Sequence, residues 1–450
     1  LEGIKFKDVR ELKKFISDLP YKLTAAQIRV LQEIISDMTS NKRMNRLVQG
    51  DVGSGKTVVS AAAMVLAVLN GYQATMMAPT EILADQHFET LKDLLKTMPI
   101  RIGLLKGSMS LKSRESILNE ISNGKLDIVI GTHALIQDSV KFKRLGLAIT
   151  DEQHRFGVKQ RIDLSGKGDL PDMLIMTATP IPRTLALILY GDLDISIIDE
   201  LPPGRKQIET YAVGSDMEDR VFSFIKKQII EGRQAYVVCP LIEEQEKLDL
   251  LSAEKTYERL TTDICPDFSI GLIHGRMSQA EKDASMRSFK TGEMNILVST
   301  TVIEVGVNVP NASIMLILNA ERFGLAQLHQ LRGRIGRGEY KSYCILINDS
   351  SNPTARERMR ILQSTSDGFK ISEKDLELRG PGEFFGTKQH GLPQLKAANL
   401  FKDMDVLKTA QEDVIQIISQ DPELLSEENA VIKGYIEDIF RKLQEEIILN

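Results

Sequence analysis

The sequence of 450 residues is long enough for two or three domains, and its content of 42% hydrophobic and 26% charged residues is ordinary for a globular protein. The formal net charge of −5 argues weakly against a nucleic-acid binder, although local groups can bind phosphates on an acidic protein. Cys239, Cys265 and Cys344 fit neither a disulfide framework nor a zinc site, and they favour a reducing, cytoplasmic location. We find no signal peptide and no apolar run of membrane-spanning length, so we expect no membrane partner.

Short apolar runs alternate along the chain with helix-length amphipathic segments, a pattern typical of parallel sheets with crossover helices. The first expected strands are residues 46–49, 74–77, 127–130, 147–150 and 174–176, with helices at 57–69, 82–95 and 111–122. The pattern breaks at Leu201-Pro202-Pro203-Gly204, where we place a linker. Further strands are expected at residues 235–239, 270–273, 295–298, 314–318 and 343–347. The sequence therefore predicts two α/β domains.

The chain becomes helical and charged after Asp349, which predicts a third, mainly helical unit. Leu378-Arg379-Gly380-Pro381-Gly382 interrupts this unit. Because proline lacks the backbone N–H and glycine favours conformations outside the helix, we expect a loop here, following a helical segment.

The strongest local signal is Gly50-Asp51-Val52-Gly53-Ser54-Gly55-Lys56-Thr57, which satisfies the pattern GxxxxGK[ST] between an expected strand and an expected helix. The glycines let backbone N–H groups turn toward phosphates, and the helix N-terminus adds a favourable dipole. Lys56 is placed to reach the β- and γ-phosphates of ATP, and Thr57 to ligate Mg²⁺. A glycine-rich turn that binds nothing is the alternative, and the flanking strand and helix argue against it.

An acidic pair, Asp151-Glu152, directly follows the expected strand at residues 147–150. Asp151 is placed to hold Mg²⁺ through water, and Glu152 to orient or deprotonate the attacking water. An acidic pair alone is commonly a solvated loop. In the same expected sheet as a P-loop, the catalytic interpretation is the better one.

The second α/β domain contains Gln330-Leu331-Arg332-Gly333-Arg334-Ile335-Gly336-Arg337. Arg334 and Arg337 can direct two guanidinium groups at one anion, and an arginine supplied across a domain cleft stabilises charge on a transferring phosphoryl group. In isolation, an ordinary basic surface turn would be the simpler interpretation.

These motifs, in this order, resemble the set found in superfamily 2 helicases, over almost the whole chain. Leu23-Thr24-Ala25-Ala26-Gln27 resembles the Q motif, which implies that Gln27 reads adenine and that Tyr21 stacks on the base. Ala78-Pro79-Thr80-Glu81 and Gly131-Thr132-His133 resemble motifs Ia and Ib, which implies contacts of Pro79, Thr80, Thr132 and His133 with the nucleic-acid backbone.

Three further stretches extend this resemblance. Thr177-Ala178-Thr179-Pro180 resembles motif III, which implies that Thr177 and Thr179 couple the nucleotide to the strand-binding side. His274-Gly275 with Met277 resembles motif IV, and the stretch that begins Thr300-Thr301 resembles motif V, in which Thr301 is a candidate DNA contact. The segment that contains Arg334 and Arg337 resembles motif VI.

Longer stretches narrow the resemblance to the RecG family: residues 151–157 (DEQHRFG), 177–187, 199–206 (DELPPGRK), 321–338 and 367–391. The last is similar to the translocation motif that RecG shares with the transcription-repair coupling factor. Arg379 and Gln389 are its candidate coupling contacts, unless Arg379 merely forms an ion pair with Glu373 or Asp375. The resemblance implies two RecA-like parallel-sheet domains in tandem, at residues 21–203 (ATP-binding) and 204–349, after a lead-in at 1–20 and before a mainly helical module at 350–450.

Membership of the RecG family would imply an ATP- and Mg²⁺-dependent DNA helicase that moves on duplex DNA and remodels stalled forks and Holliday junctions in recombination and repair. DNA is then the expected partner, with a single-stranded DNA-binding protein as a further one. RecG proteins also carry an N-terminal wedge domain. Only about twenty residues precede the Q motif, so we expect the wedge to be absent and fork specificity to be lost. Asn308 stands where motif V usually has Asp, and this change either weakens coupling or is tolerated.

Other classes of protein share some of these motifs. A switch-type P-loop ATPase would explain residues 50–57 and Asp151 but not a second domain with its own ordered motifs. A degenerate binding module is disfavoured, because no catalytic residue is lost. Among motors, an RNA helicase or a fragment of a coupling factor stays open, although residues 367–391 argue against RNA.

Overall fold

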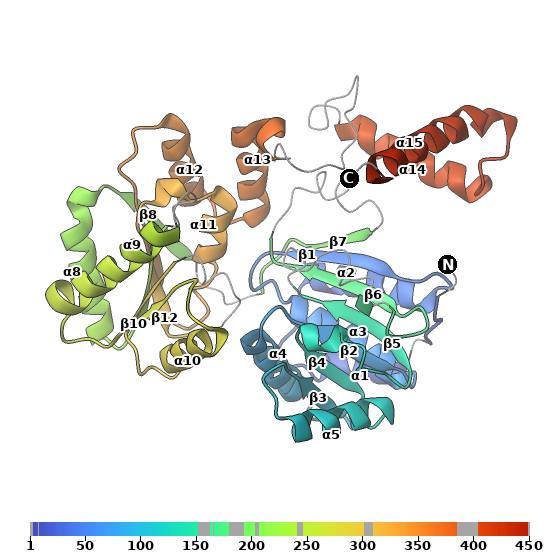
Figure 1. The fold of residues 1–450 in the computed structure, drawn as a ribbon, viewed down its shortest axis with the longest axis horizontal. Coiled ribbons are helices and arrows are strands. Elements are labelled where there is room, and N and C mark those ends of the chain that lie inside the picture. Colours follow the sequence, from blue (N-terminus) through green and yellow to red (C-terminus); the bar gives the residue numbers. More distant parts are fainter. Residues whose placement is uncertain are drawn as a thin grey trace. The chain divides into compact units, whose positions relative to one another are not determined.

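The structure is a computed structural model that describes residues 3–7, 9–151, 163–164, 166–179, 193–202, 207–240, 246–300, 309–384 and 404–448. The chain divides into two compact units, Leu1–Leu378 and Arg379–Asn450. The first unit contains two parallel sheets, drawn with their helices in Figure 1. The expected α/β fold with two parallel-sheet domains in tandem is confirmed.

The first sheet has the strand order β3-β4-β2-β5-β6-β1-β7, and every pair in it is parallel. Its strands are β1 (Asn45–Gly50), β2 (Gln73–Met77), β3 (Ile102–Leu105), β4 (Ile128–Gly131), β5 (Leu145–Thr150), β6 (Asp172–Thr177) and β7 (Asp194–Ile198). The sequence predicts the five central strands and misses β3 and β7. These two strands lie at the edges of the sheet and have partly exposed positions.

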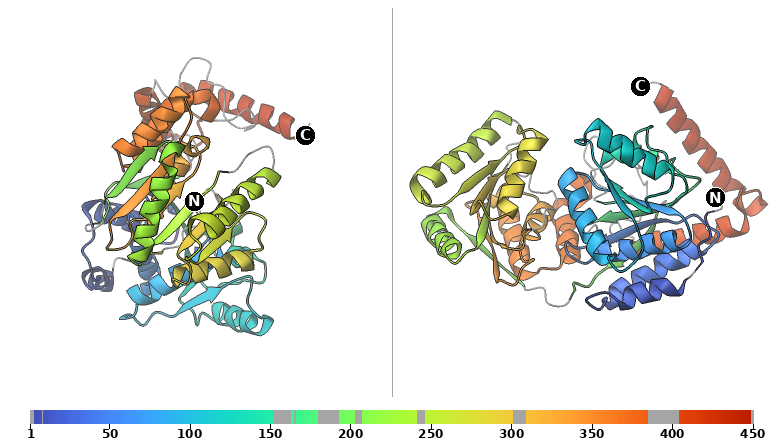
Figure 2. Two further views of the ribbon diagram at one scale, coloured as in Figure 1. Left: turned by 90° about the vertical axis from the view of Figure 1, so that its left-hand side faces the viewer. Right: turned by 90° about the horizontal axis from the view of Figure 1, so that it is seen from below.

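Helices cover both faces of the first sheet, as the two views in Figure 2 show. They are α1 (Arg10–Ser17), α2 (Ala25–Thr39), α3 (Lys56–Leu69), α4 (Glu81–Leu94) and α5 (Leu111–Ser122). Alternate residues of β5 enter different cores, because strand side chains point to opposite faces. Leu147 and Ile149 pack with α2, α3 and α4, whereas Ala148 packs in the core that contains Ile121 of α5. Helix α3 is apolar on nearly all sides and is almost wholly buried, which anchors the loop that precedes it.

The second sheet has the order β10-β11-β9-β12-β13-β8 and is also parallel. Its strands are β8 (Ile208–Val213), β9 (Gln234–Val238), β10 (Ile270–Ile273), β11 (Ile296–Ser299), β12 (Ala312–Ile317) and β13 (Ser342–Ile347). The sequence misses only the edge strand β8. Helices α8 (Glu218–Ile230) and α9 (Glu246–Arg259) belong to one face, and α10 (Gln279–Lys290), α11 (Leu325–Arg332) and α12 (Pro353–Ser364) to the other.

Helix α13 spans Gly368–Phe384, so the expected break at Gly380-Pro381-Gly382 is wrong. Proline removes a single N–H from the helix, and the cost of about 3 kcal/mol is local to one turn. Pro381 lies in the last turn, so few further hydrogen bonds depend on it. Helix propensity is a weak prior that context overrides.

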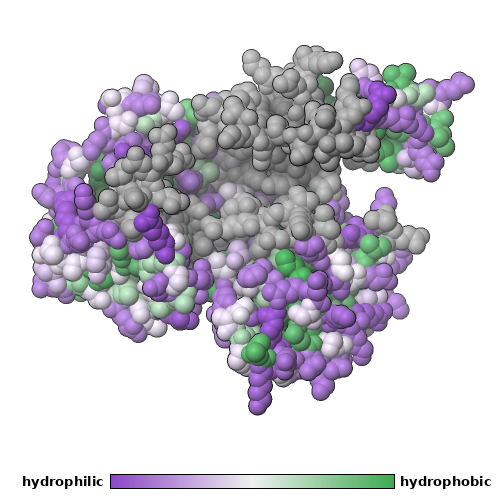
Figure 3. Space-filling view, viewed as in Figure 1, coloured by the Kyte–Doolittle hydropathy of each residue, from purple (hydrophilic) through white to green (hydrophobic). Residues whose placement is uncertain are grey.

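The second unit contains α14 (Met404–Gln420) and α15 (Ala430–Ile448). Exposed apolar side chains include Val431 and Tyr435 on α15 and Leu425 in the connection between the two helices, and Figure 3 shows green hydrophobic patches on this pair of helices. Among the described helices, none is long and apolar enough to cross a membrane.

Candidate active site

The P-loop, residues 50–57, joins β1 to α3 as the sequence predicts. Gly53 and Gly55 have φ of 78° and 84°, a left-handed backbone that favours glycine. Lys56 is buried, and its Nζ donates to the carbonyl oxygens of Gly50 at 2.7 Å and Asp51 at 3.0 Å. The ammonium group therefore lies inside the ring of the loop, at the N-terminus of α3, where backbone N–H groups and the helix dipole favour an anion.

The Q-motif segment reaches the P-loop through Gln27. Thr24 caps α2 in a capping box with Gln27, and the Gln27 Nε2 atom donates to the carbonyl of Ser54 at 2.8 Å. A side chain at Gly55 would collide with this amide. Tyr21 is 49% exposed, and its partial burial raises its pKa. Gln27 thus braces the loop, while the ring of Tyr21 lies at the surface ahead of α2.

Asp151 follows the carboxyl end of β5, and its backbone N–H donates to Met77 at the end of β2. Its carboxylate is nearly buried, and Oδ2 accepts a hydrogen bond from Nε2 of His87 at 2.7 Å. His87 lies on α4 and is also buried. No motif singles out His87, because a histidine inside a helix is ordinarily a core residue. Glu152 lies outside the described residues.

Motifs Ia, Ib and III begin where β2, β4 and β6 end, on the same edge of the sheet as the P-loop. Pro79 precedes Thr80, whose hydroxyl caps α4 by accepting from Leu83 N–H. Thr132 is buried and His133 is exposed. Thr80 and Thr132 are therefore partly structural, and His133 is the better placed of the three for an external ligand.

Motif III connects directly with the strand that leads to the P-loop. The hydroxyls of Thr177 and Thr179 lie 2.8 Å apart, and Gln49 Nε2 donates to the carbonyl of Thr179 at 3.3 Å. Gln49 is the residue before Gly50. A shift of the P-loop would therefore move the side-chain amide that contacts Thr179.

The arginine segment, residues 330–337, begins in the last turn of α11. Arg334 is buried, and Arg337 is partly buried with Nε donating to the carbonyl of Gly333 at 3.4 Å. Burial raises the pKa of Tyr236 in β9, and the nearby charges of Arg334 and Arg337 act against that shift. Arg332, which the sequence did not single out, donates to the carbonyls of Leu362 at 2.6 Å and Thr365 at 3.0 Å.

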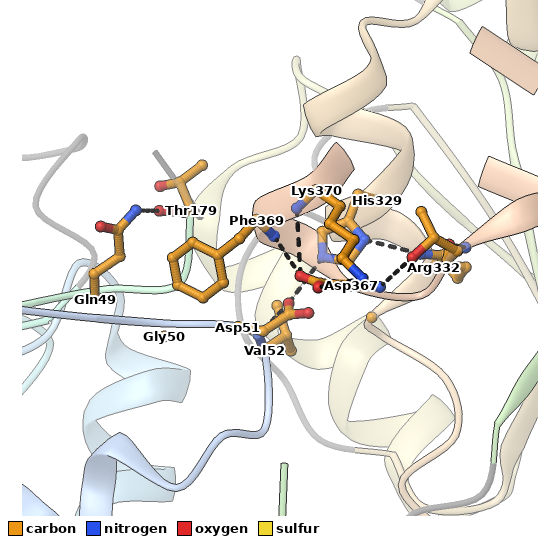
Figure 4. A network of polar contacts seen from close by, with 12 residues as sticks. Gln49, Gly50, Asp51, Val52, Thr179, His329, Arg332, Asp367, Phe369 and Lys370 are labelled. Atoms are coloured by element: carbon orange, nitrogen blue, oxygen red, sulfur yellow. Dashed lines mark hydrogen bonds and ion pairs between the residues drawn. The ribbon is translucent and has the colours of Figure 1, made fainter. Parts of the chain in front are cut away.

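The two sheets of the first unit meet at the P-loop. Nε2 of His329 lies 2.8 Å from Oδ1 of Asp51, and Arg332 contacts the other ring nitrogen, as drawn in Figure 4. Burial pushes the pKa of Asp51 upward, but the hydrogen bonds from His329 and the Val52 N–H, with the charge of Lys56, hold it below its usual value. A cavity of about 340 Å³ lies beside this contact, lined by Asp51, His329, Arg332 and residues of the interdomain segment such as Leu201 and Gln207.

The side chains of several predicted residues lie outside the described part of the structure. Thr301, Asn308 and Gln389 lie outside the described residues. Arg379 lies in α13, of which only the backbone is described at that position. For Mg²⁺, the hydroxyl of Thr57 and the carboxylate of Asp151 are the oxygen donors that a hard cation prefers. Within the described ranges, no cluster of three or more His, Cys, Asp or Glu side chains could hold a metal alone, so phosphate oxygens would complete such a site.

A P-loop on one parallel sheet that meets an arginine segment from a second sheet is the arrangement typical of two-domain, helicase-type nucleotide hydrolases. Residues 24–188 match the DEAD/DEAH box helicase family, and residues 220–339 match the helicase conserved C-terminal domain. Residues 365–445 match domain 3, C-terminal, of the ATP-dependent DNA helicase RecG. The last match makes the chain similar to RecG proteins.

Individual relatives show the same similarity. The chain is 54% identical over 423 residues to the ATP-dependent DNA helicase RecG of Bacillus subtilis, covering 94% of this chain and 62% of that protein. The RecG of Thermotoga maritima is 52% identical over 92% of this chain and 53% of its own length. A solved structure of RecG bound to a three-way DNA junction matches with a TM-score of 0.78 and 48% identity, over 90% of this chain and 53% of that one. The chain thus spans little more than half the length of these relatives.

Proposed function

We propose that this chain is the ATP-driven motor of a DNA translocase that moves on duplex DNA and remodels branched DNA, such as stalled forks and Holliday junctions. The observation that carries this proposal is the contact of the P-loop with the arginine segment of the second sheet, through Asp51 and His329. The RecG match of residues 365–445 supports DNA as the track, and it favours this proposal over an RNA helicase.

Hydrolysis would begin when ATP phosphates replace the carbonyl oxygens of Gly50 and Asp51 as partners of Lys56. Thr57 and Asp151 would hold Mg²⁺, which neutralises phosphate charge when bound. Glu152 would orient the attacking water. Arg334 and Arg337 of the second domain would stabilise the charge that develops on the transferring phosphoryl group. Hydrolysis would then depend on closure of the two domains.

DNA binding would use the edge of the first sheet that carries Pro79, Thr80, Thr132, His133, Thr177 and Thr179, together with Thr301 of the second domain. Short polar side chains and backbone amides contact phosphates and carry no sequence information. Binding should therefore weaken steeply with salt and depend little on base sequence. Arg379 and Gln389 would transmit the movement to the duplex. A single-stranded DNA-binding protein is a further partner in this proposal.

The test is steady-state ATPase activity measured in parallel without nucleic acid and with single-stranded DNA, duplex DNA, a model fork and RNA. Duplex and forked DNA should stimulate hydrolysis more than RNA does. Stimulation by RNA alone would favour an RNA helicase. Hydrolysis that no nucleic acid changes would favour a switch-type ATPase.

A further inference from the structure

Two points of contact join the P-loop to α11. His329 Nε2 lies 2.8 Å from Oδ1 of Asp51, with side chains that are 5% and 15% exposed. One helical turn later, Gly333 packs on Val52, since a Cβ at position 333 would lie 3.0 Å from the Val52 Cβ atom. Two adjacent residues of the loop are therefore fixed against one helix of the other domain.

The proton of His329 has a defined position. Nη2 of Arg332 lies 3.0 Å from Nδ1 of His329. A guanidinium group has only N–H donors, so Nδ1 must accept and the ring proton resides on Nε2, facing Asp51. The carbonyls of Leu362 and Thr365 hold Arg332 in turn. His329 thus presents one donor to one carboxylate in a fixed direction.

Asp51 is an unusual residue to find at a phosphate-binding loop, because its negative charge repels the phosphates it adjoins. The hydrogen bonds of the Asp51 carboxylate explain why this residue lies there. Oδ1 accepts from His329 and from the Val52 N–H at 2.6 Å. The carboxylate therefore serves the contact between domains, and not the contact with nucleotide.

We propose that His329 is a positioning residue for ATP hydrolysis, which docks the arginine segment on the P-loop through Asp51. This inference rests on the proposed function. Arg334 and Arg337 follow α11 directly, so the docking of that helix sets where their guanidinium groups stand relative to the phosphates. Misplacement of a catalytic group by about 1 Å costs on the order of a hundredfold in rate. Loss of the docking contact should therefore lower kcat more than it weakens nucleotide binding.

The experiment compares His329→Ala and His329→Gln in duplex-stimulated ATPase kinetics and in equilibrium binding of a fluorescent ADP analogue. Glutamine offers an amide donor toward Asp51 and an oxygen that can accept from Arg332. His329→Ala should lower kcat about tenfold or more and change the ADP Kd less than about threefold, and His329→Gln should recover most of kcat. Gln327→Glu is the matched control on the exposed side of the same helix; it keeps the oxygen that accepts from the Gly324 N–H and should keep the wild-type kcat.

A double-mutant cycle supplies the second test. If His329 acts through Asp51, Asp51→Ala and the double variant Asp51→Ala/His329→Ala should lower kcat by similar factors, because both remove one contact. Asp51→Asn keeps an acceptor oxygen, so its kcat should stay near the wild-type value. This variant still tests the contact if His329→Ala fails to fold. Wild-type kcat in His329→Ala, or single effects that multiply in the double variant, would overturn the inference. A wild-type chain without ATPase activity would instead refute the proposed function.

Discussion

Nε2 of His87 lies 2.7 Å from Oδ2 of Asp151, although the two residues are separated by 64 positions in the sequence. His87 belongs to α4, the helix that begins at the last residue of motif Ia, and Asp151 directly follows the strand β5. A carboxylate accepts hydrogen bonds, so the imidazole donates and fixes the direction of the carboxylate. The contact connects the proposed DNA-binding edge with the proposed Mg²⁺ ligand.

His87→Ala should therefore weaken Mg²⁺ binding at the nucleotide site. Outer partners of metal ligands typically contribute about 10- to 100-fold in metal affinity or activity. The measurement is a Mg²⁺ titration of fluorescent ATP-analogue binding, read at fixed analogue concentration. Glu89→Ala, an exposed change on the same helix, is the control. An unchanged Mg²⁺ midpoint in His87→Ala would show that the histidine only fills the core.

Lys56→Ala should abolish ATP hydrolysis, because the β- and γ-phosphates lose their fixed cation. The Nζ atom already lies within the P-loop, held by two backbone carbonyls. Turnover is measured by phosphate release on duplex DNA, with Lys112→Ala on the exposed side of α5 as the control. Near-normal turnover in Lys56→Ala would exclude the assignment of this lysine.

Glu152→Gln should separate binding from chemistry. Loss of a positioned base slows proton transfer by about a hundredfold or more, while the neutral amide keeps the size of the side chain. Mg-ATP should still bind with nearly wild-type affinity. Binding and single-turnover hydrolysis are measured on the same preparation. A parallel loss of both would make Glu152 a structural residue.

Arg334→Ala and Arg337→Ala should each lower kcat by about a hundredfold or more with little loss of ATP affinity, since both arginines act on charge that develops in the transition state. Arg334 is buried, so a thermal melting curve must accompany its kinetics. Arg322→Ala, which removes an exposed arginine of the same domain, is the control. If ATP affinity fell as far as kcat, the arginines would be ground-state binding groups.

Arg379→Ala and Gln389→Ala should leave DNA-stimulated ATPase activity measurable while strand separation at a model fork drops. The reason is mechanical, because the phosphate site lies in the two α/β domains and does not need the C-terminal helices for chemistry. Both activities are measured on one fork substrate. Loss of hydrolysis together with unwinding would place these residues in the ATPase cycle itself.

Local chemistry in the sequence was sufficient to predict much of the fold and of the candidate site. The P-loop, Asp151 at a strand end and the central strands could all be predicted, because glycine conformation, charge and continuous apolar runs are properties of short segments. The sequence did not predict the edge strands β3, β7 and β8, each of which has partly exposed positions. The helix through Pro381 was not predicted either: composition predicts a break, and the backbone tolerates a single missing N–H.

The partnerships of His87, His329 and Arg332 were decided by the tertiary structure alone. His329 and Asp51 are 278 positions apart, and neither carries a spacing that marks the other as its partner. Their hydrogen bond exists because two separately folded sheets place the end of α11 against the P-loop. Hydrogen bonds act over about 3 Å of space, whatever the separation along the chain, so only the packed structure can assign them.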